Sequence, residues 1–233
     1  MKKLEPVFVI VFALSLITTH AIAEENLSKS NDWHEVVYEG SAEFKLDRNS
    51  LNIFASGNDG TTYAQWEKRV KNPIGMIATV QVTSTSGDGD KFIGIRGNIG
   101  TWGNNTFLAE IRLPEWDEKT KCINYRIRER NSENNTVRVW SYGYIGDWSG
   151  EWNTDDSIVI GFAKIQNEIW FYADNYNSKK NVKTGNCFVK VQPFPTSIVK
   201  NMGSLDEPYF AINTFVDGGG FISGSVENVM IVR

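Results

Sequence analysis

Side chains along most of this chain alternate between apolar and polar with a period of two residues. The alternation begins near Trp33 and continues to the C-terminal Arg233. A period of two is that of a β-strand, whose successive side chains point to opposite faces of a sheet. Almost no stretch shows the 3.6-residue period of a helix. The chain is therefore expected to form sheets with one apolar face, which have to pack against each other.

About a dozen short strands are predicted, with turns rich in Gly, Asn and Asp between them. The clearest strand covers 75–84, where Met76, Ala78, Val80 and Val82 point to one side. Many short strands without helices or a linker predict an all-β fold, a single antiparallel sandwich. The other predicted strands cover 51–55, 63–68, 92–99, 107–113, 122–130, 137–144, 157–165, 168–174, 188–191, 209–215 and 221–232, with Gln166-Asn167 as a hairpin turn and 175–186 as a polar surface loop.

The first 23 residues are typical of a secretory signal peptide. They combine the basic Lys2 and Lys3, an apolar stretch and a small-residue site that ends at Ala23. The apolar stretch is shorter than the roughly 20 residues that span a bilayer. We expect cleavage after Ala23, a polar leader over 24–32 and one domain over 33–233. The protein is then expected to be secreted or periplasmic, with no transmembrane segment after cleavage.

The net charge limits which partners the protein can bind, and the cysteine content limits which covalent cross-links it can form. The formal net charge is −4 and there is no basic run, which argues against a nucleic-acid partner. Cys122 and Cys187 are the only cysteines. In an oxidising compartment such a pair predicts one disulfide, and two separate buried thiols are the alternative. The oligomeric state stays open.

Three segments resemble the concanavalin A-like lectin and glucanase superfamily of jelly rolls, which includes laminin-G-like modules. Phe107 to Arg112 (FLAEIR) resembles a central strand, and Ile158 to Asp174 resembles the family's hairpin with an aromatic-rich second strand. Gly224 to Arg233 (GSVENVMIVR) resembles its closing strand. The resemblance implies a jelly-roll β-sandwich. It implies no particular activity, because the superfamily contains lectins, hydrolases and lyases.

The superfamily's catalytic patterns are not matched. Retaining glucanases need two carboxyl groups about 5 Å apart, and the nearest approach to their motif, Glu115-Trp-Asp117-Glu118, has the wrong spacing and follows Pro114. Uronate lyases of this superfamily carry R-x-E-x-R, of which this chain has only Glu110 and Arg112. In a lyase, Arg112 and Arg126 would neutralise the substrate and Tyr142 would be the base.

The alternation also predicts a candidate ligand site. If the strands that carry them are neighbours in one sheet, several arginines and aromatic residues share its outer face, beside Glu110, while Val137 and Val139 point inward. Aromatic rings stack on sugars and Arg binds carboxylate or sulfate. Ordinary cross-strand pairing on a solvated sheet is the alternative. The predicted ligand-binding residues are Arg112, Arg126, Arg138, Trp140, Tyr142, Trp170 and Tyr172.

Two further sites are predicted. The segment from Trp140 to Trp152 contains five aromatic residues and is expected to form a binding loop, with Trp148 and Trp152 as lids over the sandwich end in the alternative interpretation. The resemblance implies one structural calcium ion, held near the first and last strands by Glu39, Gly40 and Glu227. No other cofactor is expected.

These patterns together predict an exported, non-catalytic β-sandwich that binds a polysaccharide or glycan, or another surface partner. A polysaccharide-cleaving enzyme with a degenerate motif is the first alternative. A scaffold or assembly protein without a small ligand is the second.

Overall fold

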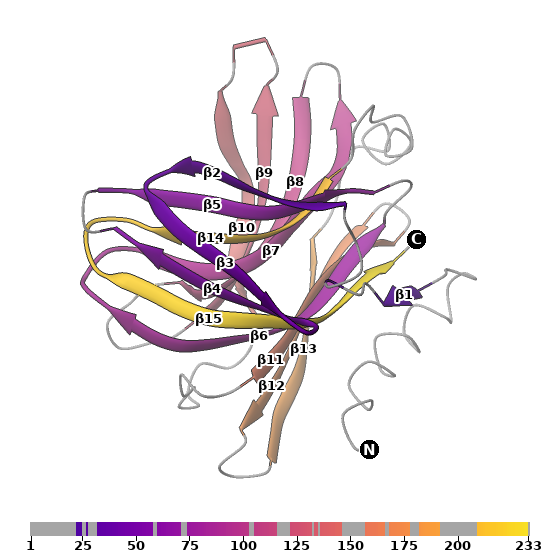
Figure 1. The fold of residues 1–233 in the computed structure, drawn as a ribbon. Coiled ribbons are helices and arrows are strands. Elements are labelled where there is room, and N and C mark those ends of the chain that lie inside the picture. The colour runs from indigo at the N-terminus through magenta and orange to yellow at the C-terminus, as the bar shows by residue number, and fades with distance from the viewer. Residues whose placement is uncertain are drawn as a thin grey trace.

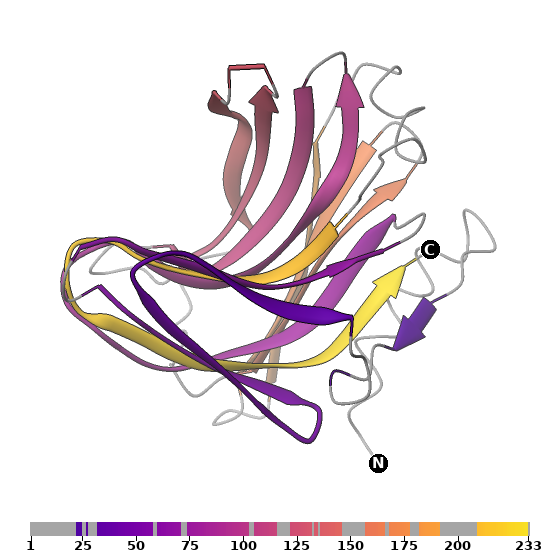
Figure 2. The ribbon, with the colours of Figure 1, turned by 45° about the horizontal axis from the view of Figure 1, so that its top comes forward.

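The computed structural model contains two antiparallel β-sheets stacked as two layers (Figure 1), and the turned view separates β2, β5 and β14 of one layer from β3, β4 and β15 of the other (Figure 2). Within the described residues there is no helix, and so none long and apolar enough to cross a membrane. The structure describes residues 22–24, 27, 32–57, 60–70, 74–102, 105–115, 122–131, 133–134, 136–145, 157–165, 168–177, 182–191 and 209–232.

The first layer is a seven-stranded sheet in the order β10-β9-β8-β7-β14-β5-β2. Consecutive strands β7 to β10 lie side by side, while β14 enters from the C-terminal end of the chain between β7 and β5. The bounds are β2 (Trp33–Glu39), β5 (Thr62–Arg69), β7 (Lys91–Trp102), β8 (Asn105–Glu115), β9 (Cys122–Asn131), β10 (Val137–Ile145) and β14 (Tyr209–Val216).

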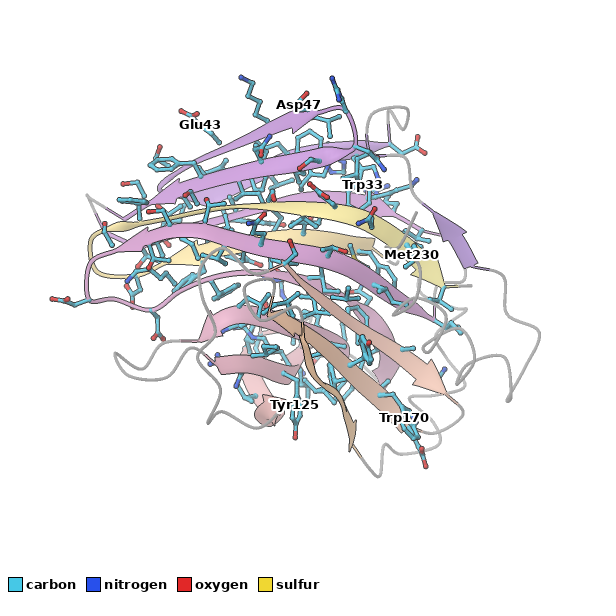
Figure 3. The ribbon with its side chains drawn as sticks, turned by 90° about the horizontal axis from the view of Figure 1, so that it is seen from below. Trp33, Glu43, Asp47, Tyr125, Trp170 and Met230 are labelled. Carbon is cyan, nitrogen blue, oxygen red and sulfur yellow. The ribbon has the colours of Figure 1, made fainter. Side chains whose placement is uncertain are left out.

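The second layer is an eight-stranded sheet in the order β13-β12-β11-β6-β15-β4-β3, with β1 paired to β15 off this path. The exposed Glu43 and Asp47 extend from the edge strand β3 (Figure 3), and charged residues of this kind protect a sheet edge from pairing with other chains. The bounds are β1 (Ile22–Glu24), β3 (Ser41–Asp47), β4 (Ser50–Ser56), β6 (Gly75–Ser86), β11 (Ser157–Ile165), β12 (Glu168–Asn177), β13 (Val182–Val191) and β15 (Phe221–Val232).

The core lies between the two layers and is made of the apolar half of the alternation. On β8, the residues predicted to point inward are all buried: Phe107, Ala109, Ile111 and Leu113. Aromatic rings join the layers. Tyr125 of β9 stacks on Phe171 of β12 with ring centroids 4.8 Å apart, and Phe162 of β11 meets Phe210 of β14 edge-on at 5.6 Å. The all-β sandwich predicted from the period of two is confirmed.

Several segments differ from the prediction. β2 and β3 complete the two sheets although neither was recognised as a separate strand, and β12 and β13 extend into the segment 175–186 that was expected to be a loop. Leu27, placed in the polar leader, packs in the core, and its N–H donates to Asn49 Oδ1 at 2.9 Å. β1 pairs Ala23 with Ile231, so it spans the predicted cleavage site. The cleavage itself stays a prediction.

A β-bulge corrects the orientation predicted for β10. The register against β9 shifts between Val139 and Ser141, which places Val139 opposite Arg128 and Tyr142 opposite Arg126. Unbroken alternation would turn Val137 and Val139 toward the core. Because the bulge shifts the register, these residues face the outer side of the sheet instead. Val137 and Val139, predicted to be inside, are 47% and 46% exposed.

Candidate functional site

The candidate site lies on the outer face of the seven-stranded sheet, meaning the face turned away from the core. The strand register aligns one row of residues across all seven strands. From β2 to β10 this row contains His34, Glu67, Ala211, Arg96, Glu110, Arg126 and Tyr142. Acidic and basic residues thus occur along the row, and three adjacent strands, β7, β8 and β9, each contribute a charged residue to it.

Glu110 is the central residue of this face. It points outward yet is only 1% exposed. Its Oε1 accepts a hydrogen bond of 2.7 Å from Asn213 Nδ2, and its Oε2 lies 2.6 Å from Arg112 Nη2, a close ion pair that is not aligned as a hydrogen bond. Burial alone would raise the pKa of Glu110, but the charges of Arg112, Arg96 and Arg128 lower it to about 2. The carboxylate is therefore charged at neutral pH.

The arginines around Glu110 contact aromatic rings as well as the carboxylate. The guanidinium carbon of Arg112 lies 4.0 Å from the centre of the Phe92 ring, a cation–π contact. Arg96 Nη1 donates to the hydroxyl of Tyr63. On β9, Arg126 Nε donates to Asn124 Oδ1 at 3.1 Å. Burial is the largest cause that lowers the pKa of Arg126, and repulsion by the charge of Arg112 is the second.

Several buried polar atoms on this face have no hydrogen-bond partner among the residues that the structure describes. They occur on β14, β7, β8 and β9, so they surround Glu110. A buried polar atom without a partner costs about 1–3 kcal/mol, and most such atoms in native proteins are satisfied by protein groups or ordered water. The atoms are Asn98 Oδ1, Arg112 Nε, Asn124 Nδ2, Arg128 Nε and Asn213 Oδ1. The group thus includes both hydrogen-bond donors and acceptors, all of them shielded from solvent.

The structure brings together only part of the predicted ligand site. Arg112 and Arg126 lie on the outer face beside Glu110, as predicted. The backbones of Arg138, Trp140 and Tyr142 belong to β10, and Tyr142 is aligned with Arg126, but the side chains of these three residues lie outside the described part of the structure. The predicted loop residues Trp148 and Trp152 lie outside it too.

Trp170 and Tyr172 do not belong to this face. They lie on β12, which is in the eight-stranded sheet, so the condition that the strands be neighbours fails. Trp170 is half-buried at the outer side of that layer (Figure 3), and its Nε1 donates to Glu168 Oε2 at 2.9 Å. Tyr172 is 3% exposed and packs with Ile77, Ala163, Met230 and Val232. Alternation gives the face of a strand but not the sheet to which it belongs.

The predicted calcium ligands are also separated. Gly40 joins β2 to β3 next to Glu39, at the end of β4 where Ser56 pairs with Ser41. Glu227 pairs with Ser50 at the other end of β4. The described residues contain no cluster of three or more acidic, His or Cys residues that could hold a metal ion. The three residues therefore do not form one site, and a structural calcium ion stays a prediction.

The two cysteines lie on different layers. Cys122 begins β9 of the seven-stranded sheet and Cys187 lies on β13 of the eight-stranded sheet, opposite Ala173. Their side chains are not among those described. The disulfide remains a prediction, with two separate thiols as the alternative.

The acidic residues described on this face do not have the spacing of a glycosidase pair. Glu67 lies in the same row as Glu110, three strands away, which is about 14 Å at the usual strand spacing. Retaining enzymes need about 5–5.5 Å and inverting enzymes about 6.5–9.5 Å. Glu67 instead lies 3.2 Å from Nε2 of His34 on the edge strand β2. His34 thus reaches this sheet face, but at its far edge from Arg126.

Sequence reasoning missed Arg96, Asn98 and Asn213, three residues of this face. Each alternates with buried apolar residues on its own strand, as in Ile93, Ile95 and Arg96 of β7. Applying alternation to β7 and β14 identifies their outward direction. The pairing of β14 with β7 cannot be predicted in this way, because more than 100 residues separate the two strands in the sequence.

Comparison with known proteins supports the fold. No protein-family model matches the sequence, and no curated protein is detectably similar to it. Among solved structures, one described as "Prominent members of the human gut microbiota express endo-acting O-glycanases to initiate mucin breakdown" is 13% identical, with a TM-score of 0.51 over 91% of this chain and 97% of that chain. The winged bean acidic lectin complexed with methyl-α-D-galactose is 8% identical, with a TM-score of 0.50 over 91% and 100%. The chain has the concanavalin A-like jelly-roll fold.

Proposed function

We propose that this protein binds a carbohydrate on the outer face of its seven-stranded sheet. The observation that carries the proposal is the group of unpartnered buried polar atoms around Glu110. Sugar hydroxyls both donate and accept hydrogen bonds. Asn213 and Asn124 are three strands apart, about 14 Å at the usual strand spacing, so the ligand that satisfies these atoms is an oligosaccharide that extends across the strands. The winged bean lectin of similar fold is complexed with a galactoside, which is consistent with this class of ligand.

Fixed side chains favour recognition of such a ligand. Asn213 is held by Glu110, Arg112 by Glu110 and Phe92, and Asn124 by Arg126. Groups that are already positioned lose little conformational entropy when a ligand binds. Export of the protein, through residues 1–23, is part of the same proposal, because extracellular and periplasmic glycans are then its accessible ligands.

Asn98→Leu tests the proposal. This change removes one unpartnered buried atom, so the variant is expected to be as stable as the wild type or slightly more stable. If the atom binds a ligand, the same variant binds its glycan more weakly. The matched control is Asn52→Leu, because Asn52 is exposed on β4 of the other sheet and its loss leaves binding unchanged.

Binding is measured on an array of neutral and acidic glycans, and thermal unfolding is measured on the same samples. Wild-type protein that binds no glycan on the array contradicts the proposal. Incubation with each retained polysaccharide, followed by measurement of its chain length, separates binding from cleavage. If the polymer is shortened, the protein cleaves the polysaccharide, and the enzyme alternative replaces the proposed binding function.

A further inference from the structure

A hollow opens at one end of the sandwich, where the chain crosses between the two layers from β2 to β3 and from β14 to β15 (Figure 2). Its volume is about 620 Å³, and small-molecule sites in proteins are usually roughly 300–1,000 Å³. The β2–β3 turn, the end of β4 and the segment that leads into β5 line it. Its lining shares no residue with the group around Glu110, so it is a separate place on the molecule.

The apolar part of the lining is the ring of Phe54 on β4. This large apolar side chain is 40% exposed. Its ring stacks on Phe221 of β15 with centroids 5.7 Å apart, and both rings lie on the outer face of the eight-stranded sheet. Cross-strand stabilisation is one use of such a pair. An accessible ring held in place by its neighbour also offers a flat apolar surface, on which the C–H groups of a sugar ring can pack.

Polar groups lie beside this ring. Ser41 and Ser56 are directly opposite each other on β3 and β4, and Ser56 leaves the same face of β4 as Phe54, two residues away. Glu39 and Thr61 also line the hollow. A hydroxyl group both donates and accepts hydrogen bonds, and a carboxylate accepts them. The hollow therefore combines hydrogen-bonding groups with an aromatic surface, which are the two kinds of contact that a sugar ring makes.

Hydrogen bonds fix the walls of the hollow. Thr62 Oγ1 donates to the carbonyl oxygen of Ser56 at 2.5 Å and accepts from the N–H of Ser41 at 3.0 Å, so it joins β3, β4 and β5. Next to it, Thr61 Oγ1 donates to Asp217 Oδ1 at 3.1 Å, which ties this segment to the turn between β14 and β15. Walls that are already ordered lose little conformational entropy when a ligand binds.

We infer that this hollow is a further saccharide site and that it binds a neutral sugar unit packed on Phe54. An anionic sugar would bring a second negative charge next to Glu39, which repels it. A purely apolar ligand would cover the hydroxyls of Ser41 and Ser56 without supplying hydrogen bonds, which is unfavourable. A neutral sugar supplies both hydroxyl groups and an apolar face. The inference does not depend on binding at the Glu110 face.

Affinity electrophoresis of the full chain tests the inference. Three gels contain the neutral polymers dextran, laminarin and galactomannan, and a fourth contains the acidic polymer polygalacturonate. The wild-type protein is expected to be retarded in at least one neutral gel. Phe54→Leu removes the ring but keeps an apolar side chain, and it is expected to bind that polymer roughly 10-fold more weakly. Phe54→Tyr keeps the ring and is expected to bind like the wild type.

Two further variants make the test independent of the ring pair. Ser56→Ala removes a hydroxyl from the hollow and keeps the carbonyl oxygen that Thr62 binds, so it is expected to bind more weakly without loss of stability. Asn52→Leu is the control, because Asn52 is exposed on the same strand but outside the lining. Thermal unfolding verifies that each variant is folded at the temperature of the gels.

Combination with Asn98→Leu separates this site from the Glu110 face. Distant, independent sites have additive effects, so Phe54→Leu is expected to cause the same fold-loss with and without Asn98→Leu. If Asn98→Leu abolishes retardation in the neutral gels while Phe54→Leu and Ser56→Ala retain it, all binding belongs to the Glu110 face and the inference is overturned.

Other outcomes also decide the matter. Retardation of the wild type in polygalacturonate alone, or equal losses in Phe54→Leu and Phe54→Tyr, overturns the inference and leaves the proposed function intact. No retardation in any gel overturns the inference, and together with no binding on the glycan array it contradicts the proposed function as well.

Discussion

Asn213 Nδ2 donates a hydrogen bond of 2.7 Å to Glu110 Oε1, although β14 and β8 are separated by β7. The intervening residue opposite Asn213 is Gly94. A Cβ at this position would lie 3.2 Å from Asn213 Oδ1 and 2.2 Å from the carbonyl oxygen of Ile111. The contact across β7 therefore depends on the absence of a side chain at position 94.

Gly94→Ala is expected to destabilise the protein and to break this contact. The clash with the Ile111 carbonyl has to be relieved by moving β7 or β8, which costs about 1–3 kcal/mol by analogy with overpacked cores. Urea unfolding measures the loss, with Ser225→Ala on the central strand β15 as a control of small effect. A Gly94→Ala protein as stable as the wild type would show that β7 and β8 are less closely packed than this geometry requires.

Glu110 is expected to make stability depend on pH in the acidic range. Its pKa is about 2 in the folded protein against an ordinary value of 4.5, so the folded state favours the charged form. The stabilisation is complete above pH 4.5 and is lost as the pH falls from 4.5 toward 2. The difference corresponds to about 3 kcal/mol. Unfolding by urea at a series of pH values between 2 and 6 measures it.

The variant Glu110→Gln isolates this contribution. It leaves the surrounding arginines without their carboxylate, so it is expected to be several kcal/mol less stable at pH 6 and to lose less further stability toward pH 2. Glu43→Gln on the exposed edge strand β3 is the control and should follow the wild-type curve. The same acid dependence in Glu110→Gln and in wild type would assign the effect to other carboxylates.

The sequence predicted the elements of this fold better than their arrangement. Alternation on β8 gave both the buried side, with Phe107 and Ile111, and the outward Glu110 and Arg112, because each strand encodes its own two faces. Alternation could not show that β12 and β9 belong to different sheets, because sheet membership depends on pairings between segments that are distant in the sequence. The separation of Trp170 from Arg126 follows from this, as does the unpredicted contact of Asn213 with Glu110.

The burial of the outward-pointing residues was also not predictable from the sequence. Glu110 and Asn213 are fully polar, and the alternation indicated a solvated face for β8. The structure buries both because the groups cover one another across four strands, β5, β14, β7 and β8: Arg112 lies over Phe92, and Arg96 contacts Tyr63. The candidate site therefore depends on contacts between strands that are distant in the sequence. Two of its arginines, Arg112 and Arg126, were nevertheless predictable.

Val139→Thr tests the β-bulge in β10. The structure exposes Val139, so the change is expected to alter the free energy of unfolding by less than about 0.5 kcal/mol. Val80→Thr on β6 is the comparison, because Val80 is fully buried and a buried hydroxyl without a partner costs about 1–3 kcal/mol. If both variants lose a similar amount of unfolding free energy, Val139 lies in the core and the alternation along β10 is unbroken.

Tyr172→Ala is expected to reduce stability without reducing glycan binding by the folded protein. Tyr172 packs with Ile77, Met230 and Val232 on the eight-stranded sheet, and truncation of a large buried side chain costs about 2–4 kcal/mol. Asn98→Leu should show the opposite behaviour, with weaker glycan binding and little change in the melting temperature. Thermal unfolding and affinity electrophoresis of the two variants, at a temperature where both are folded, make the comparison. If Tyr172→Ala keeps its stability and loses binding, the ligand site lies on the eight-stranded sheet instead.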